Sequence, residues 1–160
     1  MSERARALAE QFERAVGEFI DVVGGLSDEQ WRTLCTNEAR TVGVLARHVA
    51  AGIPFEMAVF REIAAGRQPS TITRAQLAEM NAGDAERWAR GAKDETLALL
   101  RDNAALAATE VRRLSDEQLA RTGKYVEEIP GAWTVEQWVE RVLTGHVSGH
   151  LQSIRMALAD

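Results

Sequence analysis

Three histidines are the residues of this sequence whose type and spacing most clearly indicate chemistry. His146 and His150 lie four positions apart, and His48 lies much earlier in the chain. On a helix, positions i and i+4 share one face, about 6 Å apart, so two imidazoles at this spacing can bind one metal ion. All three histidines fall on the apolar stripes of the helices expected around them. This placement predicts that they converge on one ion.

The alternative is that each histidine is a core residue whose ring nitrogens are hydrogen-bonded, which is the more frequent case for a single histidine on an apolar face. Three neutral imidazoles together suit a divalent ion such as Zn²⁺, Ni²⁺ or Fe²⁺. A site with three protein ligands leaves coordination positions open for water or substrate, as catalytic sites do. The histidines therefore predict a metal site of the catalytic type.

Four further residues are candidates for the pocket or for supporting the metal ligands. Gly52 lies one turn after His48 and would leave open volume there, although tight helix packing explains it equally well. Glu56 lies on the same stripe and can orient a ligand or act as a base, with a salt bridge to an arginine as the alternative. Ser153 can support a ligand or bond to its own helix backbone. Asn81 can approach the site from above.

The amphipathic spacing of apolar residues predicts the helices that position the histidines. The first long helix covers residues 3–23, the second 41–65 and the last 134–159. Thr41 is expected to cap the second helix, and Pro54 is expected to kink it because proline cannot donate a backbone hydrogen bond. The histidines lie on the apolar stripes of these helices and should therefore face the bundle interior.

Helix-breaking residues interrupt the middle of the chain. Thr73 and Gln76 form an expected capping box that begins a weak helix towards Arg90. Asp94 is expected to cap a renewed helix after this break. The third long helix is therefore expected to be discontinuous.

The pentapeptide "LSDEQ" occurs twice, ending at Gln30 and at Gln118. Each copy precedes a loop and then a Thr-Val pair that opens a histidine-bearing helix. Internal duplication and a shared local capping solution explain this pattern equally well. Residues 120–133 lack a helical period and are expected to form a loop, with no convincing strand pair anywhere. The elements predict an all-α four-helix bundle with short connecting helices, as a single domain over residues 1–160.

Composition and charge argue against several other classes of protein. The net charge is −5 and the basic residues are scattered, so no nucleic-acid groove is expected. No apolar run approaches the ~20 residues of a membrane span, and the charged N-terminus lacks the apolar stretch of a signal peptide. Cys35 is the single cysteine and fits a buried hydrophobic position better than a reactive thiol. A reduced cytoplasm is the simplest compartment.

The sequence resembles the DinB-like superfamily, which includes mycothiol-dependent maleylpyruvate isomerase-like and bacillithiol transferase-like proteins. The resemblance rests on "TVGVLARHVAAG", the "LSDEQ" connectors, "AEMNAGDAERW" and "WTVEQWVERVLTGHVSGHLQSIR". It implies an up-down-down-up bundle with a long crossover, a divalent metal held by His48, His146 and His150, and often a homodimer. Some relatives transfer or isomerise small substrates with a low-molecular-weight thiol that binds the metal as thiolate.

Three functional hypotheses follow from these features. The favoured one is a cytoplasmic, metal-dependent S-transferase or isomerase that uses a low-molecular-weight thiol on a small electrophile, in a pocket beside Gly52. The second is a metal-dependent hydrolase, which would act without a thiol. The third is a metal-stabilised binding or stress-response module without catalytic turnover.

Overall fold

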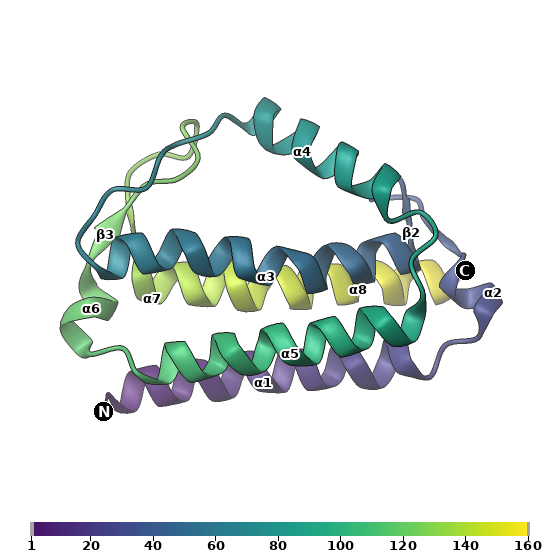
Figure 1. Cartoon of the computed structure of the whole chain (residues 1–160), viewed down its shortest axis with the longest axis horizontal. Coiled ribbons are helices and arrows are strands. Elements are labelled where there is room, and N and C mark those ends of the chain that lie inside the picture. The colour runs from purple at the N-terminus through teal and green to yellow at the C-terminus, as the bar shows by residue number, and fades with distance from the viewer. Residues whose placement is uncertain (1, 160) are drawn as a thin grey trace.

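The computed structural model describes residues 2–159, which are mainly helical (Figure 1). Figure 1 shows that α1 and α8 run in one direction along the bundle, whereas α3 and α5 run in the opposite direction. The expected all-α, up-down-down-up four-helix bundle is therefore confirmed. Its helical stretches are α1 (Glu3–Gly24), α3 (Val42–Ala64), α5 (Lys93–Arg112) and the C-terminal series α7 (Val135–Trp138), η1 (Val139–Thr144) and α8 (Gly145–Ala159).

The parallel helices α3 and α5 require a long crossover, and α4 (Arg74–Arg87) is its central part. The helix begins at the expected capping box, in which Thr73 and Gln76 bond to each other's backbone. None of the residues of α4 is buried, and Figure 1 shows the helix lying apart from the bundle, on the side of α3. The crossover helix therefore lies over one side of the bundle and contributes no buried residue to its core.

The expectation that Asp94 caps the renewed helix is wrong. The N-cap of α5 is Ala92, whose side chain makes no capping hydrogen bond, and Asp94 lies in the first turn of the helix. An acidic residue in a first turn interacts favourably with the positive end of the helix dipole. Asp94 therefore stabilises this helix start by its charge rather than by capping.

Each "LSDEQ" connector folds into a short helix followed by a two-residue antiparallel ladder. The absence of strand pairs was a wrong expectation, because ladders of two residues are too short to produce an alternating sequence pattern. The backbone N–H of Val42 donates to Thr33 at 2.9 Å, and that of Val135 donates to Arg121 at the same distance. The two connectors resemble each other beyond their helix caps, in the ladder and in this backbone hydrogen bond. This resemblance favours internal duplication over a shared capping solution. The elements are α2 (Asp28–Trp31), β1 (Leu34–Cys35), β2 (Arg40–Thr41), α6 (Asp116–Ala120), β3 (Thr122–Gly123) and β4 (Trp133–Thr134).

The core lies between the four long helices, and α5 packs against both α1 and α3. By length and composition α3 is apolar enough to cross a membrane. The expectation that no stretch of the chain is long and apolar enough was therefore wrong. However, 61% of its most apolar 18-residue window is buried inside the fold, as in the core helix of a bundle.

Cys35 is fully buried, and burial raises the pKa of its thiol. The largest fully buried side chains include Phe12, Phe19, Phe60, Leu45, Leu100, Leu143 and Ile154.

Candidate metal centre and its cavity

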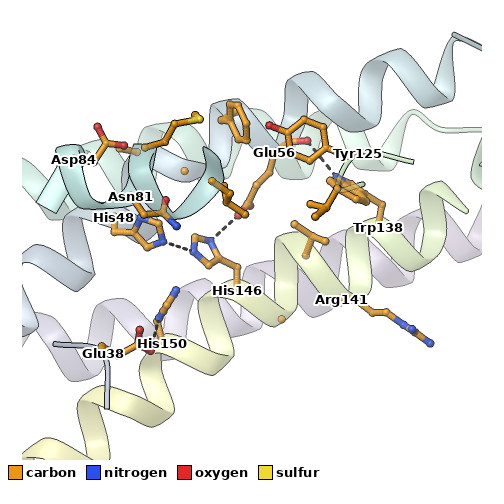
Figure 2. A pocket seen from close by; sticks show the side chains of 18 of the residues that line it. Glu38, His48, Glu56, Asn81, Asp84, Tyr125, Trp138, Arg141, His146 and His150 are labelled. Atoms are coloured by element: carbon orange, nitrogen blue, oxygen red, sulfur yellow. Dashed lines mark hydrogen bonds and ion pairs between the residues drawn. The ribbon is translucent and has the colours of Figure 1, made fainter. Parts of the chain in front are cut away.

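The three histidines converge between α3 and α8 (Figure 2). One ring nitrogen of each of His48, His146 and His150 can be chosen so that all three atoms lie within 4.8 Å of one another. The Nε2 atoms of His48 and His146 are 2.9 Å apart. At this distance one ring donates its N–H to the lone pair of the other, or both lone pairs bind one cation. The spacing therefore fits two ligands of one ion as well as a hydrogen bond between neutral imidazoles.

The expectation that these histidines face the bundle interior is wrong. Both histidines of α8 are half-buried and lie at the edge of the core, as does His48. Residues 139–144 wind as a π-helix, whose wider turn shifts the register of a stripe counted at α-helical spacing. The core positions of this C-terminal stretch are instead Leu143, Val147, Leu151 and Ile154.

Glu56 on α3 lies against the ring of His146. Its Oε1 is 2.6 Å from the Nδ1 atom, although the ring N–H does not point along a hydrogen bond to it. At 2.6 Å the ring nitrogen and the carboxylate oxygen are in direct contact. Glu56 is only 8% exposed, and its Oε2 has no hydrogen-bond partner. This carboxylate therefore holds His146, not an arginine, and retains one buried oxygen for another donor.

Glu38 supports His150 and was not found from the sequence. Its Oε1 lies 3.0 Å from Nδ1 of His150 and accepts a hydrogen bond from the Ser153 hydroxyl at 2.9 Å. The side-chain amide of Asn37 donates to the same hydroxyl at 3.0 Å. Ser153 therefore lies beside the site, where its hydroxyl group holds Glu38 in place. It makes no hydrogen bond to the backbone of its own helix.

The turn between β1 and β2 places Glu38 at the cluster. The backbone N–H of Glu38 donates to the carbonyl of Cys35 at 3.0 Å, and Ala39 adopts a left-handed φ of 54°. Such a φ is uncommon for a residue other than glycine and marks a tightly specified turn. The available signal in the sequence was one acidic residue in "CTNEAR", just before the Thr41 cap. A turn residue belongs to no helical stripe, so periodicity did not find it.

Replacing Glu38 by alanine is expected to weaken metal binding roughly 10- to 100-fold. The change removes the acceptor that fixes the orientation of the His150 ring, while all three ligands stay in place. Competition with a chelator of known affinity measures the effect. Glu29→Ala, an exposed acidic position in α2, is the matched control and should bind as the parent does. Equal affinities of the two variants would contradict the role assigned to Glu38.

Burial keeps two of the histidines neutral. It lowers the pKa of His48 from 6.5 to about 3, assisted by the charges of the other two histidines. Burial and His146 lower the pKa of His150 to about 4, against the opposite effect of Glu38. Burial by itself raises the pKa of Glu38, but the bond from Ser153 and the contacts with His150 lower it overall. At neutral pH His48 and His150 are therefore unprotonated, as metal ligands must be.

This donor set fits a divalent metal ion. The Nδ1 atoms of His146 and His150 face carboxylates, which places the ring proton on Nδ1 and leaves Nε2 as the ligand atom. Carboxylate-supported imidazoles of this kind bind Zn²⁺, Ni²⁺ or Fe²⁺. Three nitrogen ligands form an incomplete coordination shell, so further positions remain for a small molecule.

A cavity of about 560 Å³ adjoins the histidines, between the bundle and α4. Asn81 lines it from α4, above His48 in Figure 2, and makes no bond to the histidines. Gly52 also lines the cavity, but its lack of a side chain serves a different purpose from the expected one of leaving open volume. A Cβ at this position would lie 3.1 Å from Cε1 of His146, so the glycine admits the imidazole ring itself.

Comparison with known proteins agrees with this description. A family model described as the DinB superfamily matches residues 11–154. Among solved structures, YfiT from Bacillus subtilis superposes with a TM-score of 0.80 at 18% sequence identity, covering 99% of this chain and 89% of YfiT. YfiT is described as a probable metal-dependent hydrolase with an unusual four-helix bundle topology. No curated protein matches the chain. At this identity the likeness to YfiT shows a shared fold.

Proposed function

The chain belongs to the DinB superfamily, and we propose that it is a divalent-metal-dependent enzyme that transfers a low-molecular-weight thiol to a small electrophile. The observation that carries this proposal is that the three histidines open onto a cavity of about 560 Å³. A structural metal site is closed by protein ligands, whereas this one adjoins a space in the range typical of small-molecule pockets. That space leaves room for a thiol and an electrophile together.

His48, His146 and His150 would hold the ion. When bound, it supplies a Lewis acid that lowers the pKa of a thiol or a water molecule. Glu38 and Glu56 keep two of the imidazoles oriented, which preserves the geometry of the three nitrogen atoms. The chain thereby provides a preorganised site rather than one assembled by the substrate.

Glu56 is the proposed proton acceptor. Its Oε2 is buried and unpaired, and the residue lines the cavity beside His146. In the proposed transfer, the thiol proton passes to this oxygen while a sulfur–carbon bond forms to the electrophile. A leaving group departs with the electron pair of the broken bond. With an epoxide, the carbon–oxygen bond breaks instead, and the opened oxygen keeps the electron pair and takes the proton back from Glu56. A buried carboxylate oxygen without a donor is suited to accept a proton at this point.

Hydrolysis is the second candidate, and the same unpaired oxygen of Glu56 supports it. A carboxylate that accepts a proton from a thiol can equally accept one from water. YfiT, which shares this fold, is described as a probable metal-dependent hydrolase, and this description supports the hydrolysis candidate. The two reactions differ in whether a thiol is consumed.

Rate measurements on metal-loaded protein distinguish these candidates. Bacillithiol, mycothiol and glutathione are each combined with chlorodinitrobenzene or an epoxide, and p-nitrophenyl acetate is supplied without thiol. Thiol-dependent turnover that falls about 10²- to 10⁴-fold in Glu56→Gln, at unchanged metal content, supports S-transfer with Glu56 as base. Turnover of the ester alone supports hydrolysis. A stoichiometric metal that raises the melting temperature without any turnover would overturn both and favour the non-catalytic module.

A further inference from the structure

The cavity has two chemically different ends. At one end lie the histidines with Glu38, and at the other lie aromatic side chains that the metal site does not use. These side chains come from four parts of the chain, namely α3, the segment between β3 and β4, β4 itself, and α7. We call them the aromatic wall, which consists of Phe55, Tyr125, Trp133 and Trp138.

The rings of the aromatic wall support one another. Phe55 and Tyr125 meet edge to face with centroids 5.6 Å apart, and Tyr125 and Trp138 meet likewise at 6.0 Å. The ring centroids of Trp133 and Trp138 are 6.0 Å apart. The guanidinium carbon of Arg141 lies over the Trp133 ring, 5.4 Å from its centroid. The indole N–H of Trp138 donates to the backbone carbonyl of Glu56 at 3.4 Å. These contacts fix the rings before any ligand arrives.

The crossover helix supplies an apolar surface opposite this wall. Leu77 and Met80 line the cavity from α4, and Met80 is 46% exposed. Phe55, on the opposite side, is 40% exposed. Two exposed large apolar side chains on facing walls of one cavity are unfavourable in water, and an apolar occupant would cover both.

We infer that the substrate of this site carries a flat, uncharged aromatic ring, bound between the aromatic wall and Met80. Its polar, reacting end then lies towards His146 and Glu56. The unpaired Oε2 of Glu56 lies between the two ends and disfavours an anionic group beside it. Which end reacts rests on the proposed function, whereas binding of the ring requires only the cavity.

The ring is tested by a ¹H–¹⁵N NMR titration of the Zn²⁺-loaded and metal-free chain with 2-naphthylmethanol. Of the four tryptophans, Trp88, Trp133 and Trp138 line the cavity, so their indole N–H groups report on the site. We expect the signals of Trp133 and Trp138 to shift in both samples, while Trp31, which lies outside the cavity, stays in place. Glucose, a polar molecule without an aromatic ring, should shift none of them.

Variants on the two facing walls provide the second measurement. Phe55→Ser and Met80→Ser should each raise the dissociation constant of 2-naphthylmethanol about three- to tenfold. Met156→Ser is the matched control, because Met156 is 55% exposed and lies outside the cavity. The inference is overturned if 2-naphthylmethanol leaves the cavity indoles unshifted, or if the control weakens binding as much as the cavity variants do.

This titration is independent of turnover. Ring binding in a chain that shows no reaction with any thiol or ester would retain the inference and remove the proposed function. Turnover of electrophiles without an aromatic ring, in a chain that does not bind 2-naphthylmethanol, would do the reverse.

Discussion

Replacing His146 by alanine is expected to weaken metal binding by more than about a hundredfold, a larger loss than that expected for a supporting residue. His146 is the central member of the cluster, with Nε2 facing His48 and Nδ1 facing Glu56. The truncation removes one of three nitrogen ligands. It also leaves the buried Glu56 without the ring it supports. Two remaining imidazoles cannot hold an ion at comparable affinity.

Elemental analysis after gel filtration, together with chelator competition, measures this loss. Gln152→Ala is the matched control, because Gln152 is an exposed position on the same helix. It should retain one ion per chain with parental affinity. If His146→Ala also retained one tightly held ion per chain, the three-histidine site would be wrong and the histidines would be hydrogen-bonded residues at the edge of the core.

Replacing Gly123 by alanine is expected to destabilise the fold by about 1–3 kcal/mol. A Cβ on Gly123 would lie 2.5 Å from Cγ1 of Ile63 and 2.9 Å from its Cδ1. Ile63 is 1% exposed and its branched side chain is packed at the end of α3. The β3 strand must therefore move away from α3. Gly123 pairs with Trp133 in the ladder, so the aromatic wall should move with it.

Urea unfolding measures the change, with Gly17→Ala as a control of opposite sign. A Cβ on Gly17 meets no atom within 4 Å, and the residue is exposed inside α1. Alanine there should stabilise the protein by about 0.5–1 kcal/mol, because glycine is entropically costly in a helix interior. An unchanged free energy of unfolding for Gly123→Ala would show that the ladder yields easily and does not hold the aromatic wall in place.

Features that depend on a few neighbouring residues were predictable. The capping box at Thr73 and the capping solution shared by the two "LSDEQ" copies were readable because each involves side chains and backbone within four positions. The spacing of His146 and His150 was readable for the same reason, since a helix places i and i+4 on one face. Apolar periodicity was sufficient for the bundle, because each long helix must bury one stripe.

Features that depend on distant segments were not predictable in this way. Glu38 is separated from His150 by 112 positions, and it reaches the ring only because a two-residue ladder and a left-handed turn aim it there. The π-helix over residues 139–144 changes which side chains enter the core without leaving a gap in the apolar pattern. The direction of His146 and His150 followed from that register and not from the stripe.

Amino-acid order alone therefore specified the long helices, the capping boxes and the i, i+4 pair of imidazoles, since these follow from contacts within one or two helical turns. Tertiary packing decided what surrounds the ion. The crossover placed α4 over the bundle and formed the cavity, and the second connector placed Trp133 beside Trp138 on its wall. Such placement arises from the burial of apolar surface over the whole chain, a non-directional force whose result cannot be counted along a single segment.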